Sequence, residues 1–376
     1  MPKPKVALYG LTSEAYRLAA GIVDKAQVTI VDETLQMAMD LDAPFLKRNP
    51  SLEEMMSEEP LLGVKPLEKV IGDSQFVIFT PKLRRPAEEA LIEAGTKMRD
   101  LSRYLAKGTI LVNALPTGPG GNSENIMLVE KQTGLKVGDG LIYAYAPIRP
   151  REHKPAFVAV AGGKDKPVLE PIGMTQNSQN IFSAELEYAS SVLETAIDSV
   201  TEIELARRAR EARVTLQRTS DAYVDDFAKY LYELKALQAS DETGESISYF
   251  AGAILKSLEN YVRYVVDETR EVLKEKELKA SRTKIALVWS LDRYEMRGER
   301  LQLAESIQQR LRDYVTDVEI VSGARVKGGA EILDPLKHNV LIACSKEDHD
   351  ALKQAKKGHR NVESTVVLAT PALKRE

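Results

Sequence analysis

The first 163 residues alternate between two hydrophobic patterns. Short apolar runs, typical of buried parallel strands, are separated by stretches whose apolar residues recur every three or four positions, as in amphipathic helices. The strand-like runs lie at residues 6–9, 28–31, 76–79, 109–112, 141–146 and 156–161. The helical stretches lie at 15–23, 86–107 and 123–131, and a shorter helical piece is expected at 33–40. This alternation predicts a doubly wound, mostly parallel sheet.

The pattern changes near residue 180. Residues 182–280 contain almost no strand signal, and helical patterns run through 184–213, 220–239 and 247–278. Strand-like runs return at 285–288, 318–321, 340–343 and 365–368, with helical stretches at 299–314 and 347–356. We therefore expect an α/β protein with an N-terminal Rossmann domain at 1–178, an all-helical domain at 179–281 and a smaller C-terminal Rossmann-like domain at 282–376.

The two long helices of the middle domain carry more apolar surface than one small domain needs. Residues 182–213 and 245–280 are both amphipathic. Large apolar faces favour self-association, so we expect a homodimer or a larger homo-oligomer formed through these helices. The alternative is that they pack only on each other and on the flanking domains.

Composition removes several classes of protein. The chain has 376 residues, a formal net charge of −4 and one cysteine, Cys344. A slightly acidic chain gives no support to a nucleic-acid partner. No apolar run reaches the roughly 18 residues of a membrane span, and the first ten residues lack the apolar core of a signal peptide. The single cysteine excludes an internal disulfide and fits a reducing compartment, so we expect a cytoplasmic protein without a membrane partner.

Residues 6–32 form the strand–helix–strand start of a dinucleotide-binding fold. Gly10 follows the first strand. Asp32 ends the second strand, at about the 20-residue distance from which an acidic side chain reaches the ribose of the dinucleotide. We therefore take Gly10, Leu11, Thr12 and Asp32 as candidate cofactor-binding residues, with NAD as the candidate cofactor.

The glycine fingerprint of such folds, G-x-G-x-x-G/A, is incomplete. Its three positions carry Gly10, Thr12 and Ala15, and Thr12 places a Cβ where the pyrophosphate normally meets bare backbone. Glu14, in the first helical turn, would satisfy the helix dipole itself and repel a phosphate. Two interpretations stay open: a scaffold whose helix N-terminus is satisfied internally, or an unusual NAD(P) site. Asp32 is equally ambiguous, because acidic residues at strand ends also cap turns.

Three further stretches could bind an anion. The loop 118–121 precedes a helix, so its backbone N–H groups could cradle a phosphate, although such loops more often only turn a strand into a helix. Two basic clusters follow strand ends, where open α/β sheets bind ligands, but such clusters are more often solvated surface. They consist of Lys82, Arg84 and Arg85, and of Arg149, Arg151, His153 and Lys154. No metal site is expected, because the histidines of the chain are scattered.

Several motifs resemble the UDP-glucose/GDP-mannose dehydrogenase family, the nucleotide-sugar 6-dehydrogenases. Residues 133–138 (TGLKVG) followed by 143–147 (YAYAP) resemble the family segment sGLKvGxDFxLxYsPER. Other similar stretches are 10–20, 157–163, 184–206 and 284–287. The resemblance implies an NAD-binding domain, a dimerising helical domain and a UDP-binding domain, and it makes Arg293 and Arg297 the candidates for binding the substrate nucleotide.

The catalytic motifs of that family are missing. Its members oxidise an alcohol twice through a thiohemiacetal on a cysteine of a G-G-x-C-x-P-x-D loop, because only a strong nucleophile can capture the aldehyde. No such loop occurs between Arg213 and Lys284, and Cys344 ends an apolar strand elsewhere, where we expect core packing. Ile148 stands where the family has an acidic residue, and residues 114–120 lack its glutamate. We therefore assign no catalytic residue.

Two functions of different classes follow. The first is a non-catalytic homologue of the nucleotide-sugar dehydrogenases with a structural, assembly or regulatory role, with or without a bound nucleotide. The alternative is an active NAD(P)-dependent oxidoreductase that acts on a UDP-sugar or related substrate by a non-cysteine mechanism. A single hydride transfer needs only an acid or base and a cofactor, which keeps the alternative open.

Overall fold

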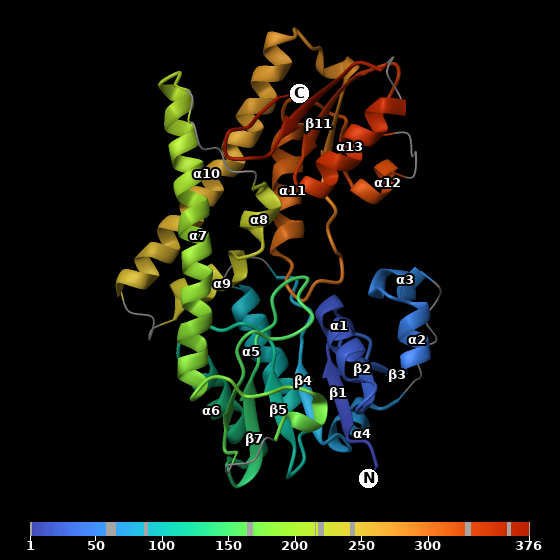
Figure 1. Cartoon of the computed structure of the whole chain (residues 1–376), viewed down its shortest axis with the longest axis vertical. Coiled ribbons are helices and arrows are strands. Elements are labelled where there is room, and N and C mark those ends of the chain that lie inside the picture. Colours follow the sequence, from blue (N-terminus) through green and yellow to red (C-terminus); the bar gives the residue numbers. More distant parts are fainter. Residues whose placement is uncertain are drawn as a thin grey trace. The chain divides into compact units, whose positions relative to one another are not determined.

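A computed structural model gives the fold (Figure 1). It describes residues 2–57, 65–85, 89–163, 168–214, 216, 222–240, 245–327, 332–358 and 362–375. The chain divides into two compact units, each discontinuous in sequence. Unit 1 contains Met1–Ser191, Lys235–Ser248 and Asp292–Gly298; unit 2 contains Val192–Leu234, Tyr249–Leu291 and Glu299–Glu376. The three-domain division expected from the sequence remains a prediction.

Unit 1 is built on an eight-stranded sheet. Its strands are β1 (Lys5–Tyr9), β2 (Gln27–Asp32), β3 (Met37–Leu41), β4 (Phe76–Phe79), β5 (Ile110–Asn113), β6 (Lys136–Val137), β7 (Gly140–Tyr145) and β8 (Ala159–Ala161). Across the sheet they follow the order β3-β2-β1-β4-β5-β7-β6, with β8 paired to β7. The pairs are parallel except for β3 on β2 and β8 on β7. The predicted mostly parallel sheet is confirmed.

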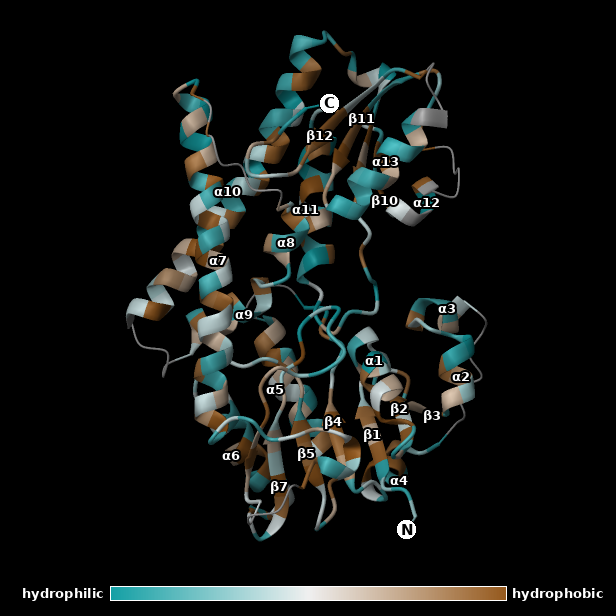
Figure 2. Ribbon diagram, viewed as in Figure 1, coloured by the Kyte–Doolittle hydropathy of each residue, from teal (hydrophilic) through white to brown (hydrophobic). Residues whose placement is uncertain are grey.

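The central strands are apolar on both faces. Every residue of β4 and β5 is buried, and the strands of this sheet are largely brown in Figure 2. A parallel strand without a polar face has to be covered on both sides, as in doubly wound folds. The helices between the strands are α1 (Ser13–Ile22), α2 (Ala43–Arg48), α3 (Leu52–Ser57), α4 (Leu67–Gly72), α5 (Glu89–Ser102) and α6 (Gly121–Thr133); a short 3₁₀ helix, η1 (Glu170–Ile172), follows β8.

The helix expected at 33–40 is wrong. The chain reverses directly after β2, with Gln36 in the left-handed region at φ +54°, and β3 then pairs antiparallel with β2. The Asp32 carboxylate stabilises this reversal, because its Oδ1 accepts from the N–H groups of Thr34 and Leu35 at 2.9 and 3.0 Å. The free edge of β2 then pairs with the next residues of the chain, which satisfies its backbone groups better than a solvated helix would.

Unit 2 contains a four-stranded parallel sheet. Its strands are β9 (Thr283–Val288), β10 (Val318–Val321), β11 (His338–Ala343) and β12 (Ser364–Leu368), in the order β10-β9-β11-β12. The accompanying helices are α8 (Val224–Ala228), α11 (Glu299–Arg312), α12 (Gly323–Lys327), α13 (Lys346–Gly358) and the 3₁₀ helix η3 (Ala280–Arg282). The second α/β region predicted from the sequence is confirmed.

The long helical patterns form α7 (Ile181–Glu211) and α10 (Glu245–Glu275), each of 31 residues. The single helix expected at 220–239 is wrong. Its described part forms α8 and α9 (Leu231–Ala239), which are separated by a turn at 229–230, where the N–H of Tyr230 donates to the carbonyl oxygen of Phe227; residues 220 and 221 lie outside the described part. Within the described residues, no helix is long and apolar enough to cross a membrane.

Candidate functional site

Open α/β sheets bind ligands beyond the carboxyl ends of their strands, where the strand order reverses. In the first sheet this point lies between β1 and β4, which lead into Gly10 and Thr80. Gly10 has a φ of +128°, and a Cβ there would lie 1.9 Å from the carbonyl oxygen of Thr80. The close approach of the two strand ends therefore requires glycine, whether or not a phosphate binds.

The first turn of α1 is capped by Thr12. Its Oγ1 accepts from the N–H of Ala15 at 3.2 Å and donates to the carbonyl oxygen of Thr80 at 3.3 Å. Leu11 and Thr12 are both buried. Thr12 thus satisfies one of the N–H groups that a helix leaves open at its start.

Asp32 lies at the end of β2, and its carboxylate is occupied by the turn that follows it. Each of the four predicted cofactor residues therefore has a role inside the chain: Gly10 in packing, Leu11 in the core, Thr12 and Asp32 in capping. Their assignment to a cofactor remains a prediction.

A segment from much later in the chain lies against the start of α1. Asp292–Gly298 (the inserted segment) connects β9 to α11 but belongs to unit 1. The N–H of Ser13 donates to the carbonyl oxygen of Tyr294 at 2.8 Å, and the N–H of Met296 donates to Glu14 Oε2 at 2.8 Å. The N–H groups in the first turn of such a helix face the phosphates in a dinucleotide site. Here the partner of the Ser13 N–H is a peptide carbonyl.

The loop after β4 contacts the same segment. The N–H of Leu83 donates to the carbonyl oxygen of Met296 at 2.8 Å. Arg84 Nη2 donates to the carbonyl oxygens of Arg293 and Glu295, at 2.8 and 2.7 Å. The basic cluster that the sequence proposed as a phosphate site thus directs its Arg84 side chain to the backbone of the inserted segment.

Lys82 of that cluster contacts an aromatic ring through its ammonium group and the buried carboxylate of Glu33 through its backbone N–H. Its Nζ lies 5.2 Å from the ring centre of Tyr294. Its N–H donates to Glu33 Oε1 at 3.0 Å, and Lys97 Nζ lies 2.8 Å from the same oxygen. Burial lowers the pKa of Lys82, and the nearby positive charges of Arg84 and Lys97 add to the effect.

Glu14 is the least expected side chain of this crevice. Both Glu14 and Met296 have an exposed fraction of 0%. The nearest charged partner of the carboxylate is Arg17, at 3.7 Å from Oε1. Two like charges 4 Å apart repel by about 4 kcal/mol at an effective dielectric constant of 20. A phosphate at the start of α1 would therefore meet both an occupied N–H group and a repelling carboxylate.

The glycine-rich loop before α6 holds a carboxyl group, and this group is the side chain of Glu185 of α7. The N–H groups of Gly120 and Asn122 donate to its two carboxylate oxygens at 2.9 and 2.8 Å. Asn122 Nδ2 and Thr117 Oγ1 also donate to Oε1, at 2.8 and 3.3 Å. Glu185 is fully buried, and burial raises its pKa by more than these hydrogen bonds lower it. The cradle predicted at 118–121 is thus filled from within the chain.

In the second sheet the strand order reverses between β9 and β11, and α8 lies at this point. The N–H groups of Val224 and Asp225 donate to the carbonyl oxygens of Ala369 and Cys344, which follow β12 and β11, at 2.8 and 3.1 Å. The Asp225 carboxylate accepts from Nε1 of Trp289, directly after β9, at 2.7 Å. One short helix thus contacts the ends of three strands.

Two buried carboxylates complete this second crevice. Asp225 forms an ion pair with Arg300 at 2.5 Å, and their side chains are only 7% and 5% exposed. Asp348 accepts from the N–H and the hydroxyl of Ser290, at 3.1 and 2.6 Å. Burial raises the pKa of Asp348, and the charge of Asp225 raises it further. Ser290 follows β9, where a glycine-rich turn would otherwise hold phosphates.

The remaining candidates are dispersed. Arg293 and Arg297 lie on the inserted segment and belong to unit 1, whereas the second sheet belongs to unit 2; their role in substrate binding remains a prediction. Arg149 donates to Ser191 Oγ at 2.5 Å.

Cys344 is buried as predicted, and burial raises the pKa of its thiol well above the usual range. No cluster of metal-binding side chains occurs among the residues described.

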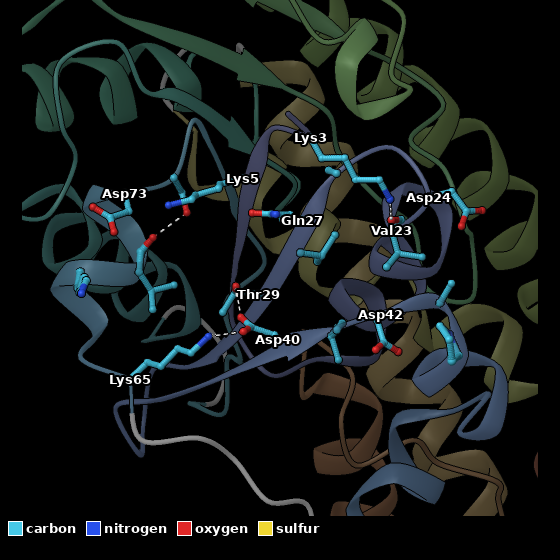
Figure 3. Close-up of a pocket in the computed structure, with 18 of the residues that line it drawn as sticks. Lys3, Lys5, Val23, Asp24, Gln27, Thr29, Asp40, Asp42, Lys65 and Asp73 are labelled. Carbon is cyan, nitrogen blue, oxygen red and sulfur yellow. Dashed lines mark hydrogen bonds and ion pairs between the residues drawn. The ribbon is translucent and has the colours of Figure 1, made fainter. Parts of the chain in front are cut away.

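A large hollow of about 910 Å³ lies in unit 1 near the amino ends of β1 and β2 (Figure 3). Its side chains carry both charges, and Lys65 and Asp40 form an ion pair within it. Lys3 donates to the carbonyl oxygen of Val23 at 3.3 Å. Because parallel sheets bind ligands at the carboxyl ends of their strands, this hollow is at the wrong edge for the predicted cofactor.

Sequence reasoning missed Glu185 and Asp225 as crevice residues. A signal existed for Glu185. It shares the buried face of α7 with Ala184, Tyr188 and Val192, and a carboxylate at helical spacing on an apolar face needs a buried partner. No comparable signal points to the inserted segment.

Comparisons with known proteins agree on the fold. No protein-family model matches the chain, and no curated protein matches it in sequence. Among solved structures, a UDP-D-ManNAc dehydrogenase from Pyrococcus horikoshii superposes with a TM-score of 0.64 at 14% identity, over 98% of this chain and 96% of that one. A UDP-glucose dehydrogenase from Pyrobaculum islandicum gives 0.55 at 14% identity, over 98% and 90%, and a UDP-N-acetyl-mannosamine dehydrogenase from Staphylococcus aureus gives 0.55 at 14%, over 91% and 95%. The chain therefore has the two-sheet α/β fold of the nucleotide-sugar dehydrogenases.

Proposed function

We propose that this chain is a non-catalytic homologue of the nucleotide-sugar dehydrogenases with a structural, assembly or regulatory role. One observation carries the proposal: the inserted segment occupies the start of α1, with the buried Glu14 carboxylate as its hydrogen-bond acceptor. The solved structures with this fold are named as dehydrogenases, so the scaffold itself is one that supports the chemistry in other proteins.

Both steric and electrostatic features of the α1 start oppose dinucleotide binding. In a dinucleotide-binding fold the pyrophosphate accepts from N–H groups at the start of the first helix. In this chain the Ser13 N–H has the carbonyl oxygen of Tyr294 as its partner. Displacing the inserted segment would leave the Glu14 carboxylate next to the phosphates, which costs binding energy instead of supplying it.

The cysteine chemistry of the related enzymes has no counterpart that we can assign. A nucleophilic cysteine acts as the thiolate in a partly exposed, electropositive site. Cys344 is buried, its pKa is raised, and its nearest acidic groups, Asp348 and Asp225, add to the rise. This supports the assignment of no catalytic residue.

We further propose that the chain forms a homo-oligomer through α7 and α10. Exposed apolar side chains on these helices are Phe182, Leu186, Ile197, Leu205, Tyr249 and Phe250. Light scattering should give at least twice the chain mass. Ile197→Glu should shift the protein toward the monomer, whereas Asp198→Lys at the neighbouring exposed position should not. A wild-type protein that is strictly monomeric would contradict this part of the proposal.

Titration calorimetry tests whether the chain binds the cofactor or the substrate of a nucleotide-sugar dehydrogenase. We expect no binding heat when NAD, NADP, UDP or UDP-N-acetylmannosamine is added to millimolar concentration, with a known NAD-dependent dehydrogenase as the positive control. Saturable binding of NAD, or reduction of NAD in the presence of a UDP-sugar, would overturn the proposal in favour of an active oxidoreductase.

A further inference from the structure

We propose that the crevice between β1 and β4 has become a receptor for a peptide turn, and that the inserted segment of the same chain is its ligand. The inference rests on the proposed function, because it names what the crevice binds in place of a dinucleotide.

The contacts recognise the backbone of four consecutive residues. The carbonyl oxygens of residues 293, 294, 295 and 296 all accept hydrogen bonds from the crevice, and the N–H of residue 296 donates one. The crevice groups are the N–H groups of Ser13 and Leu83, the guanidinium of Arg84 and the carboxylate of Glu14. Recognition through main-chain hydrogen bonds, with pockets for a few side chains, is one of the recurring ways in which proteins bind peptides.

The chemical pattern of the crevice distinguishes a peptide from a pyrophosphate. A pyrophosphate offers only acceptors and negative charge, whereas a peptide backbone offers both acceptors and donors. Ser13, Leu83 and Arg84 supply donors that would suit either ligand. Glu14 supplies an acceptor, which suits only the ligand that carries an N–H group. Glu14 is therefore the residue that selects the peptide and rejects the anion.

Two side chains of the segment add apolar anchoring. Met296 is fully buried, and the ring of Tyr294 lies under the ammonium group of Lys82. Within the segment, Asp292 Oδ1 accepts from the N–H of Tyr294 at 2.8 Å, which stabilises a turn before binding. A preformed turn loses less conformational entropy when it binds, so a short peptide can retain measurable affinity.

The segment is attached to the chain at both ends, so it binds as an intramolecular ligand. Short flexible linkers give effective concentrations in the millimolar range. A peptide with only millimolar affinity in solution would therefore still occupy the crevice when it is part of the chain. This sets the concentration range of the test.

The test separates the ligand from the receptor. A variant with Arg293→Gly, Tyr294→Gly, Glu295→Gly and Met296→Pro disables the ligand and keeps the length of the loop, because Met296→Pro removes the N–H that donates to Glu14 and the glycines destabilise the turn. A fluorescent synthetic peptide of residues 291–298 is then titrated to about 2 mM and followed by anisotropy, against a peptide of the same composition in scrambled order. We expect saturable binding of the native-order peptide to the variant, at least twofold tighter than to the wild-type chain, in which the tethered segment competes for the crevice.

Glu14→Ala in the same four-residue variant should weaken peptide binding at least tenfold, because it removes the acceptor for the Met296 N–H. Glu124→Ala is the matched control, since Glu124 is an exposed acid in the first turn of α6, and it should leave peptide binding unchanged. Equal binding of the native-order and scrambled peptides, or no effect of Glu14→Ala, would overturn the proposal.

NAD is titrated into the four-residue variant in parallel. NAD binding there, without peptide binding, would overturn the peptide receptor and identify the segment as a cover over a live dinucleotide site. NAD binding to the wild-type chain would instead overturn the proposed function, so the two failures are distinguishable. If the variant does not fold, hydrogen exchange of the wild-type chain decides: residues 292–298 should be protected and Glu14→Ala should accelerate their exchange, whereas unprotected amides would overturn the proposal.

Discussion

The two sheets close their ligand-binding edges with opposite electrostatic arrangements. At the first sheet the acid belongs to the crevice, where Glu14 accepts from an N–H of the inserted segment. At the second sheet the acid belongs to the occupant, where Asp225 of α8 accepts from Trp289 and pairs with Arg300. The first crevice therefore repels anions, whereas the second retains a cation and an N–H donor that hold a carboxylate.

This difference shows that a crevice without a ligand needs hydrogen-bond partners from its own chain. A ligand crevice presents polar groups that a bound molecule would satisfy, and buried polar groups without partners cost about 1–3 kcal/mol each. In this chain peptide carbonyls, Glu185 and Asp225 provide those partners. Either charge arrangement can satisfy the buried polar groups of a crevice, because these groups require a hydrogen-bond partner and not a particular ligand.

The largest effect is expected in the second crevice. Arg300→Ala leaves the Asp225 carboxylate buried without its cation, which should cost about 3–5 kcal/mol of unfolding free energy. The only tryptophan, Trp289, donates to Asp225, so its emission should shift to longer wavelength as α8 separates. Lys229→Ala is the control, because Lys229 caps the end of α8 and its half-exposed ion pair with Asp226 is worth only about 0–1 kcal/mol. Equal urea midpoints for the two variants would contradict closure by a buried charge pair.

A smaller effect is expected in the first crevice. Glu14→Ala leaves the Met296 N–H buried without an acceptor and should cost about 1.5–3 kcal/mol. The exposed Glu124→Ala should cost at most about 1 kcal/mol. Tryptophan emission should stay unchanged in both variants, because Trp289 belongs to the other unit. An emission shift like that of Arg300→Ala would show that the two crevices do not close independently.

Glu185→Gln provides a comparison with a third carboxylate. It removes one acceptor from the Gly120 N–H and should cost about 1–3 kcal/mol at low pH. Burial raises the pKa of Glu185, so the protonated form is favoured in the folded state. The contribution of the Glu185 side chain to the free energy of unfolding is therefore complete below the ordinary glutamate pKa of about 4.3. It is lost as the pH rises through the raised pKa of Glu185 in the folded state. Urea unfolding between pH 4 and 8 should therefore show the difference between wild type and variant shrinking with pH; a difference that grows would contradict this.

The smallest effect is expected at Asp32. Asp32→Asn keeps an oxygen for the N–H groups of Thr34 and Leu35. The free energy of unfolding, measured by urea denaturation, should therefore change by no more than about 0.5 kcal/mol. Asp32→Ala removes that oxygen and should cost about 1 kcal/mol. If wild-type protein bound NAD and Asp32→Asn abolished the binding, Asp32 would be a ribose ligand and the first crevice would not be closed.

The parallel sheets were predictable because their signals are local. The apolar runs 76–79 and 110–112 are typical of strands covered on both faces, and they form β4 and most of β5. The long helices follow their periodic patterns. The prediction failed at 33–40, where a helical reading of a short stretch competed with the free edge of β2. It failed again at 220–239, where a turn at 229–230 divides one helical pattern into two helices.

The candidate site was predictable only in part. The possibility that the start of α1 is satisfied internally was read from Thr12 and Glu14, and both side chains do hydrogen-bond within the chain. The partner of Glu14 could not be read, because Met296 lies 282 positions away. The sequence predicted that the loop at 118–121 could hold an anion, but it did not predict that the Glu185 carboxyl group occupies the loop.

The two sheets, the long helices and the missing cysteine loop can be predicted from the sequence, because each depends on neighbouring residues or on their spacing. The groups that fill the crevices can be identified only in the folded chain. Glu14, Glu185 and Asp225 meet partners 282, 65 and 64 positions away. A buried carboxylate has to find its hydrogen-bond partners wherever packing brings donors together, and that place is set by the whole fold and not by the residues beside it.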